Sequence, residues 1–374
     1  MIYFDNAATT YLKPRQVYTA LNRSVKLLSS NPGRSSHRAA LLASEALYNA
    51  REAVADLFGC ESQRVVFTYN ATYALNLAIK TTIKEKCHVI ISDLEHNSVI
   101  RVLNSLKNSL GIEFSRFQSD RLSEESLKKI LRNDTKAIIS TLASNVTGKE
   151  IDELLLSNFA KKYGLKLILD ASQAAGHRKI DLKKTPCDVL CAPGHKALFG
   201  IMGSGLAVFS GDERGASFIE GGSGSDSISY EMPRSLPDGY EAGTVALPAI
   251  ITLGEGCRFI KKTGEDNIKC KLTEYTKIIT ERLSEYKDMK IFSEGSGIVS
   301  FSLKGISSSE LASLLDKYGI AVRAGLHCAP EAHKKLGTIE EGLVRSSLSF
   351  FNTKKEVDKF CTIINKIVKK DFRG

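Results

Sequence analysis

The feature that most constrains the fold is a regular alternation of short apolar runs with amphipathic stretches over residues 60–210. This alternation is typical of a parallel sheet covered by helices. Helices are predicted over residues 71–83 and 154–163, and the second ends before Gly164. The sequence therefore indicates an α/β structure. The predicted strands are residues 64–68, 88–92, 112–117, 136–143, 166–170, 188–192 and 205–209.

The rest of the chain follows a different pattern. Residues 211–245 are rich in Gly, Ser, Asp and Pro, which predicts a long loop of the kind that often serves a function. A helical pattern then runs from Pro248 to about Glu285, and a final helix is predicted over 354–369, with strands between them at 298–302 and 321–323. At 374 residues the chain is long enough for two domains. We expect a large domain of residues 14–248 and a smaller α+β domain of residues 1–13 and 249–374.

Composition argues against several classes of protein. No apolar run approaches the roughly 18 to 20 residues of a membrane-spanning helix. Eight scattered cysteines and no evident leader predict reduced thiols in the cytoplasm rather than a disulfide framework. The net charge of +10 comes from lysines spread over helical stretches without an aromatic platform, which favours solvated helix faces over a nucleic-acid site. A basic surface would still attract anionic ligands.

Two charged residues follow neighbouring predicted strands. Asp170 ends the apolar run 166–170, and Lys196 comes shortly after the run 188–192. Open parallel sheets bind ligands at the carboxyl ends of their strands. An acidic residue and a lysine at that edge suit pyridoxal phosphate (PLP) chemistry, in which the lysine forms a Schiff base and the carboxylate keeps the pyridine nitrogen protonated. Each residue alone also fits an ordinary strand end or a surface charge.

Other polar residues are predicted at the same edge. The backbone N–H groups of Asn70 and Ala71 and the Thr72 hydroxyl open a helix, where they could bind a phosphate or simply cap the helix. His96 follows the strand 88–92, where its ring could stack on a flat cofactor or lie at the surface. Together these positions favour the PLP interpretation, although each alone also fits an ordinary helix cap or a surface histidine.

A third cluster lies in the smaller domain. Cys328 stands in a glycine-containing turn beside His327 and Arg323, a setting that favours a nucleophilic thiolate. The other cysteines lie in or beside apolar segments and are interpreted as small buried hydrophobes. Cys187, Cys191 and His195 have a spacing that suggests zinc, but strand geometry separates the two cysteines and a fourth ligand is missing, so no metal is expected. Those other cysteines are Cys60, Cys87, Cys187, Cys191, Cys257, Cys270 and Cys361.

Arg345 lies in a predicted half-buried strand, residues 343–350. An arginine in such a strand needs an anionic partner. A substrate carboxylate would satisfy its planar fork, and an internal Asp or Glu would do so equally well.

In this order the segments resemble the cysteine desulfurase and selenocysteine lyase family of fold-type I PLP enzymes, the class V aminotransferase-like group. The resemblance extends from residues 3–10, which are similar to the family's opening segment, to Arg345 and the following residues 352–358. It implies a mostly parallel central sheet flanked by helices, with a smaller α+β domain. It also implies PLP as cofactor.

The resemblance assigns a role to individual residues. Lys196 would bind PLP covalently, Asp170 would pair with the pyridine nitrogen, and His96 would stack on the ring. Cys328 would accept the substrate sulfur, and Arg345 would bind the substrate carboxylate. The remaining roles are ring contact by Gln173, cofactor and substrate contact by Asn145, phosphate binding by Thr72, Ala71 and His195, pocket lining by Arg323 and His37, and phosphate binding across a homodimer by Thr244.

The family's activity is then the expected function: L-cysteine would give L-alanine and a persulfide on Cys328, for transfer to an acceptor protein or a reductant. Pro193, Ala71 and Leu326 differ from the usual subgroup pattern.

Alternatives that remain open are selenocysteine lyase, cysteine sulfinate desulfinase or another class V aminotransferase-like enzyme, and a non-catalytic scaffold for a sulfur carrier. A nucleotide-binding module around residues 221–225 is disfavoured, since no helix or Lys-Ser/Thr pair follows the glycines.

Overall fold

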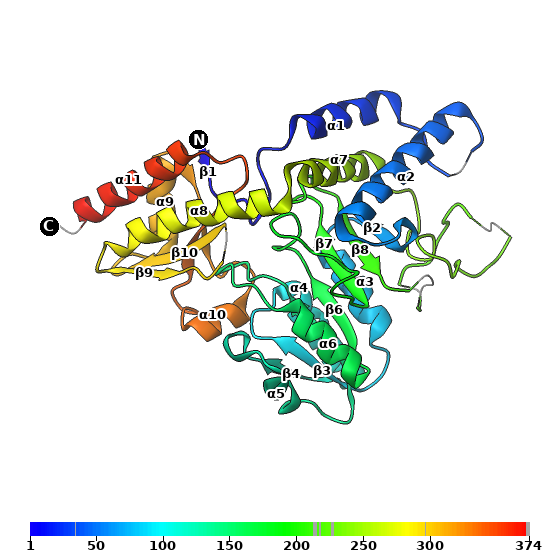
Figure 1. Ribbon diagram of the computed structural model, residues 1–374, viewed down its shortest axis with the longest axis horizontal. Helices are drawn as coiled ribbons and strands as arrows, with labels where there is room; N and C mark the ends of the chain where they lie inside the picture. The colour runs from blue at the N-terminus through cyan, green and yellow to red at the C-terminus, as the bar shows by residue number, and fades with distance from the viewer. Residues whose placement is uncertain (34, 212–214, 217, 226–227, 296, 372–374) are drawn as a thin grey trace.

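The computed structural model describes residues 1–33, 35–211, 215–216, 218–225, 228–295 and 297–371, and Figure 1 shows its arrangement. Its main sheet has seven strands in the order β2-β8-β7-β6-β5-β3-β4. All neighbouring pairs are parallel except those of β8, which is antiparallel to both β2 and β7. The predicted α/β class and mostly parallel sheet are therefore confirmed. The strands are β2 (Val65–Thr68), β3 (His88–Ser92), β4 (Glu113–Phe117), β5 (Thr135–Thr141), β6 (Lys166–Asp170), β7 (Val189–Pro193) and β8 (Gly205–Phe209).

Apolar side chains cover both faces of this sheet. Along β3, Val89 and Ile91 join one buried cluster with helices α3 and α4, whereas Ile90 joins the other cluster with α2, α6 and α7. Because alternate residues of a strand point to opposite faces, a strand buried on both faces is a continuous apolar run. The helices around the sheet are α1 (Arg15–Leu27), α2 (Arg38–Phe58), α3 (Ala71–Thr82), α4 (Asn97–Leu110), α5 (Glu124–Lys128), α6 (Glu153–Tyr163) and α7 (Leu247–Thr263), with short 3₁₀ turns at Ser62–Arg64 and Ser119–Arg121.

The smaller part of the molecule contains a four-stranded antiparallel sheet in the order β12-β13-β10-β9 and a parallel pair of β1 with β11. Helix α8 contacts β9, β10 and α11, and both chain ends lie on this side of the molecule (Figure 1). Its elements are β1 (Ile2–Tyr3), α8 (Glu265–Ser284), β9 (Met289–Phe292), β10 (Ile298–Leu303), α9 (Ser308–Lys317), β11 (Ile320–Ala321), β12 (Arg323–Gly325), α10 (Pro330–Leu336), β13 (Leu343–Ser347) and α11 (Lys354–Asp371).

Two predicted elements are divided in the structure. The helix expected from Pro248 to Glu285 is broken into α7 and α8 at Gly264, whose φ of +85° is incompatible with a continuous right-handed helix. The strand expected at 321–323 is divided between β11, which pairs with β1, and β12, which pairs with β13. The prediction of a long loop is confirmed, since the described residues of 211–245 form no helix or strand.

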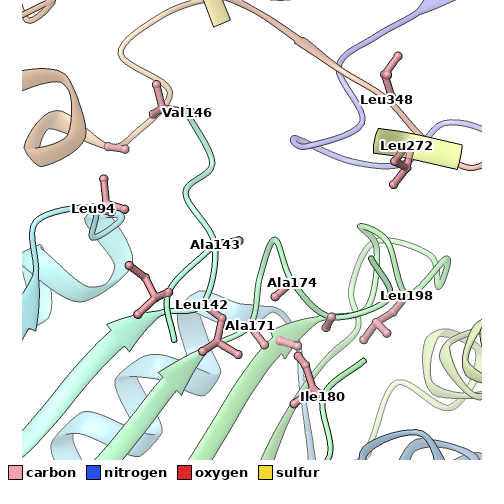
Figure 2. Close-up of a cluster of buried hydrophobic side chains, with 14 of the residues drawn as sticks. Leu94, Leu142, Ala143, Val146, Ala171, Ala174, Ile180, Leu198, Leu272 and Leu348 are labelled. Carbon is pink, nitrogen blue, oxygen red and sulfur yellow. The ribbon is translucent and has the colours of Figure 1, made fainter. Parts of the chain in front are cut away.

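The apolar core continues from the ends of the main strands into the smaller part. Figure 2 shows Leu142 and Ala171 at the ends of neighbouring strands, Val146 farther along the connection that follows Leu142, and Leu272 and Leu348 on separate segments at the upper right. All five belong to one buried cluster. All five side chains are almost completely buried. This continuous packing holds the smaller sheet above the carboxyl edge of the main sheet, which is the edge where a ligand site was predicted.

None of the helices among the described residues combines the length and hydropathy needed to span a bilayer.

Candidate active site

A pocket that is open to solvent lies at the carboxyl edge of the main sheet. Strands β5, β6 and β7 and the first turns of α3 and α4 all contribute to its wall. The predicted site residues Ala71, Thr72, His96, Asn145, Asp170, Gln173, His195 and Lys196 all line it, together with Asn70, Ser98, Thr141, Ala143, Ser172 and Pro193. The structure therefore brings together residues that lie up to 126 positions apart in the sequence.

Asp170 and Lys196 carry the two central charges of the pocket. Asp170 ends β6 almost completely buried, and its Oδ1 accepts a hydrogen bond of 2.8 Å from the backbone N–H of Ser172. Lys196 follows β7 in a tight loop that is closed by a bond of 2.9 Å from the Phe199 N–H to the Lys196 carbonyl. Burial lowers the pKa of Lys196 to about 8, against the opposing attraction of Asp170. An amine of this pKa is partly neutral near physiological pH and can accept a proton at Nζ.

His96 is held in a defined orientation at the start of α4. Its Nδ1 accepts a bond of 3.1 Å from the backbone N–H of Ser98, so in the neutral ring the proton lies on Nε2. Burial lowers the pKa of His96 to about 4, which keeps the ring neutral. The Ser98 hydroxyl lies 2.9 Å from His96 Nδ1 and 2.8 Å from the Thr72 hydroxyl. The interpretation of His96 as a surface histidine is therefore wrong.

The start of α3 has the features of an anion site. Asn70 caps the helix by accepting a bond of 2.9 Å from the Tyr73 N–H, and Ala71 and Thr72 of the first turn line the pocket. The first N–H groups of a helix have no partner within the helix and can bind an anion. The first residue of β8, Gly205, lies against Asn70 so closely that an added Cβ would come within 2.8 Å of Asn70 Cα. Only glycine permits this close approach, which fixes the helix end beside the sheet.

Two further predicted residues contact the N-terminal segment. Gln173 Nε2 donates a bond of 3.0 Å to the Ala7 carbonyl, and His195 Nδ1 lies 3.1 Å from the Thr9 hydroxyl. Burial lowers the pKa of His195 to about 4, so its ring is neutral and keeps one N–H as a donor. The N-terminal segment, residues 3–10, thus completes the site by supporting residues at the ends of β6 and β7.

The loop that carries Cys328 is attached to this pocket. The Asn97 N–H donates a bond of 2.8 Å to the Cys328 carbonyl, and Asn145 Nδ2 donates one of 2.6 Å to the His327 carbonyl. Arg323 Nη2 lies 3.5 Å from Cys328 Sγ, which is exposed. The predicted nucleophile, its arginine neighbour and Asn145 therefore meet at the pocket mouth.

Arg345 has an internal anionic partner, the second of the two alternatives that the sequence left open. Its Nη2 lies 2.8 Å from Asp5 Oδ1, and its Nη1 donates a bond of 2.9 Å to the Asn145 carbonyl. The side chain is 1% exposed, and its Nε has no hydrogen-bond partner among the described residues. A buried guanidinium with an unused donor retains capacity for a second anion.

Five predicted site residues are absent from the described residues that line the pocket. Cys328 and Arg323 belong to the loop that is bonded to Asn145, and Arg345 donates to the Asn145 carbonyl, whereas His37 and Thr244 lie elsewhere. His37 is exposed at the start of α2, where its Nδ1 accepts a bond of 3.2 Å from the Ala40 N–H. Thr244 is exposed and lines a separate cavity with Tyr73 and Glu241. Neither residue is among the described residues that line the pocket.

The burial of the cysteines agrees with the prediction at every position except one. Cys87, Cys187, Cys191, Cys257 and Cys361 are buried and Cys60 is partly buried, as predicted. Cys270 is exposed, so its interpretation as a buried hydrophobe was wrong. The reason is its position on α8, whose buried stripe includes Ile268, Leu272, Ile279 and Leu283 and leaves residue 270 on the outer face. All eight cysteines are free, and the described residues contain no cluster of His, Cys, Asp and Glu suited to a metal ion.

Comparison with known proteins agrees with this geometry. The family model "Aminotransferase class-V" matches residues 2–360. This chain belongs to the class V aminotransferase family. It is 30% identical over 390 residues to a "Probable cysteine desulfurase" of Borreliella burgdorferi, covering 99% of this chain and 92% of the relative, and 30% identical over 387 residues to one of Pyrococcus abyssi, covering 99% and 94%. The apo structure of the cysteine desulfurase from Thermococcus onnurineus NA1 superimposes with a TM-score of 0.92 at 29% identity, over 98% of this chain and 94% of that one.

The family match and the similar structure confirm, at the level of family and fold, the resemblance found in the sequence. Class V aminotransferases depend on PLP. Sequence reasoning did not identify several residues that complete the site. Asp5, Ser98 and Thr9 were not singled out because short polar residues near turns are common, and no local pattern relates them to residues far along the chain.

Glu95 is another such residue. Its side chain is fully buried, and its Oε1 accepts bonds from the Ser92 hydroxyl and, at 2.8 Å, from the Thr141 N–H. Its Oε2 has no hydrogen-bond partner among the described residues. Burial, with a smaller contribution from Asp170, raises the pKa of Glu95 from 4.5 to about 8, so at neutral pH this side chain is an uncharged acid.

This raised pKa predicts a pH dependence of stability. The folded protein holds the Glu95 proton between pH 4.5 and about 8, where the unfolded chain has lost it, so the free energy of unfolding contributed by Glu95 falls as pH rises through this window. Glu95→Gln keeps an uncharged acceptor oxygen and should remove this part of the slope. Urea denaturation at half-unit steps from pH 4.5 to 8.5 would measure it.

Glu113→Gln is the matched control for this experiment. Glu113 is exposed, and its hydrogen bond with Arg132 lowers its pKa, so its contribution changes only in acid, below the Glu95 window. If the Glu95→Gln protein keeps the wild-type slope between pH 4.5 and 8, then Glu95 is ionised in the folded protein and our assignment of an uncharged acid is wrong.

Proposed function

We propose that this protein is a PLP-dependent cysteine desulfurase that converts L-cysteine to L-alanine and receives the sulfur on Cys328. The observation that carries this proposal is the attachment of the Cys328 loop to the pocket that holds Lys196 and Asp170, through the Asn97 and Asn145 hydrogen bonds. A lysine and carboxylate alone would suit many PLP enzymes. An exposed thiol held at the mouth of the same pocket adds a sulfur acceptor.

The residues of the pocket fit the cofactor. Asp170 offers a buried carboxylate for the pyridine nitrogen, Lys196 an amine, and His96 a neutral ring face, while Gln173 lies beside Asp170 for the ring hydroxyl. The phosphate would bind at the start of α3, to Ala71 and Thr72 and to the neutral ring of His195. When bound, PLP supplies an electron sink for the bonds broken at the substrate.

The substrate would bind between the pocket and the Cys328 loop. Arg345 retains an unused, buried Nε–H donor for the substrate carboxylate while Asp5 fixes the guanidinium from the other side. Asn145 contacts both Arg345 and the Cys328 loop, so it sets the distance between the carboxylate site and the thiol. Arg323 lies beside Cys328 Sγ and lines the same mouth.

The protein groups then carry out proton transfer and sulfur transfer. Lys196 accepts the α-proton of the substrate at Nζ, which its lowered pKa permits. The Cys328 thiolate forms a bond to the substrate sulfur as the carbon–sulfur bond breaks, and the electron pair of that bond stays with the substrate carbon. Protonation of this carbon and return of the proton from Lys196 to the α-carbon give alanine, so L-cysteine and the Cys328 thiol become L-alanine and a Cys328 persulfide.

We further propose a cytoplasmic homodimer with shared active sites. His37 and Thr244 lie outside the pocket of their own chain, which is consistent with a role in the pocket of a partner subunit. The persulfide would pass to an acceptor protein or a small reductant. We retain the division into residues 14–248 and residues 1–13 with 249–374 as part of this proposal.

An assay with three substrates tests the function. The purified protein, supplied with PLP and dithiothreitol, should release sulfide and alanine in equal amounts from L-cysteine and should form a visible absorption band with PLP. Absence of the band would contradict the cofactor assignment and favour a non-catalytic scaffold. Faster alanine formation from selenocysteine or cysteine sulfinate than from cysteine would assign the protein to selenocysteine lyase or desulfinase chemistry instead.

A further inference from the structure

The turn that presents Cys328 has a strained backbone. The Ala329 N–H donates a bond of 2.9 Å to the Leu326 carbonyl, which closes a tight turn with His327 and Cys328 at its centre. Both central residues have positive φ, +53° for His327 and +58° for Cys328. A turn with two positive φ angles ordinarily contains Asn and Gly, because positive φ is sterically unfavourable for other residues. Surrounding contacts must therefore hold this turn.

A chain of buried hydrogen bonds contacts the turn from the side of α10. His327 is 2% exposed, with its Nε2 at 3.3 Å from the Arg323 carbonyl and its Nδ1 at 3.2 Å from His333 Nε2. His333 is 0% exposed, and its Nδ1 lies 2.8 Å from the Thr338 hydroxyl. The two imidazole rings stack with centroids 5.5 Å apart. Three side chains thus connect the end of α10 to the centre of the strained turn.

Proton positions in this chain follow from its chemistry. The Arg323 carbonyl can only accept, so His327 Nε2 carries a hydrogen. Burial lowers the pKa of His327 to about 3 and also lowers the pKa of His333, so both rings are neutral. His327 Nδ1 then accepts from the His333 Nε2–H, and His333 Nδ1 accepts from the Thr338 hydroxyl. Every group has one partner of the right kind.

We propose that His333 and Thr338 are positioning residues for Cys328, acting through the ring of His327 to hold the strained turn. The backbone bonds from Asn97 and Asn145 hold the same turn from the other side. Helix α10 itself is fixed to the main sheet edge, since Lys335 lies 3.1 Å from Asp93 and 2.7 Å from Asp120. The turn is therefore held by Asn97 and Asn145 on one side and by the chain from His327 to Thr338 on the other. The catalytic role of this positioning rests on the proposed function of Cys328 as sulfur acceptor.

Three variants test this assignment: His333→Leu, His333→Gln and Thr338→Val. Leucine cannot donate to His327 Nδ1, whereas the glutamine amide offers an N–H near the position of His333 Nε2. Hydrogen exchange measured by mass spectrometry on the peptide that contains Ala329 reports the turn directly. We expect exchange to be about tenfold faster in His333→Leu, the effect of losing one buried hydrogen bond, and close to wild type in His333→Gln. Thr338→Val should fall between them.

Turnover should follow the same order. With L-cysteine, kcat should fall by about tenfold in His333→Leu while KM and the cofactor absorption band stay unchanged, because the loss of one hydrogen bond displaces only the thiol. His333→Gln should restore kcat. A merely structural role for His333 would instead lower stability without a difference in kcat between the two variants.

His88→Leu is the matched control. His88 is also a fully buried histidine with two hydrogen-bond partners, Thr135 at 2.8 Å and Ser115 at 2.9 Å, but it lies at the first residue of β3, away from the Cys328 turn. This variant should leave exchange at Ala329 unchanged. Equal exchange in wild type and His333→Leu, or equal acceleration in His88→Leu, would overturn the assignment.

The exchange measurement also separates this inference from the proposed function, because it needs no turnover. A protein that forms no alanine from L-cysteine but shows the expected exchange pattern would lose the proposed function and keep the positioning role. A protein that forms alanine but shows no change in exchange would keep the function and lose the positioning role.

Discussion

Lys196→Ala should form alanine from L-cysteine at least about a hundredfold more slowly than wild type, since placed proton transfer alone contributes roughly 10² to 10⁴ in rate. Lys196 is the one lysine among the described residues lining the pocket, and burial lowers its pKa to about 8, as proton acceptance requires. The variant should also lose the absorption band that wild type forms with PLP. Alanine quantified at saturating L-cysteine, alongside the spectrum, would measure both effects.

Lys166→Ala is the control for this experiment. Lys166 begins β6 at the opposite edge of the same sheet, where it is exposed and forms an ion pair of 2.8 Å with Asp188. Exposed ion pairs contribute little to stability, so this variant should keep the wild-type rate. Wild-type turnover by Lys196→Ala would show that another group performs the proton transfer.

Cys328→Ala should lower sulfide release and alanine formation from L-cysteine by roughly a hundredfold or more, the scale of effect seen when a nucleophile is removed. Its absorption band with PLP should stay unchanged, because Cys328 lies at the pocket mouth and is absent from the described residues that line the pocket. The combination of a normal cofactor spectrum with lost sulfur transfer would separate the thiol's role from that of Lys196. Methylene blue detection of sulfide and alanine quantification would measure the two products.

Cys270→Ala provides the matched control, since Cys270 is the other exposed cysteine and lies on the outer face of α8. It should retain full activity. Alanine formation that is unaffected by the loss of Cys328 would contradict the sulfur-acceptor role and favour chemistry that releases selenium or sulfite without a protein thiol.

Much of the main sheet was predictable because its strands are buried on both faces. Strands β3, β6 and β8 begin and end at the predicted residues, since each is a continuous apolar run bounded by polar or loop-forming residues. The long helix after residue 247 was predicted as one element because the local pattern carries no information on the backbone angle of Gly264. Local periodicity thus determined the elements, but not every break between them.

The sequence by itself also indicated most of the pocket. Parallel strands place their carboxyl ends at one edge, so polar residues that follow successive strands, such as Asp170 and Lys196, must lie close together. The tertiary structure decided the contacts between distant segments. These are the bond between Arg345 and Asp5, the burial of Glu95, the bond from Asn97 to the Cys328 carbonyl, and the contact of His327 with His333. Periodicity reports which face of an element is buried. Hydrogen-bond partners from distant elements depend instead on how the two sheets and their helices pack together, and that packing leaves no local pattern in the sequence.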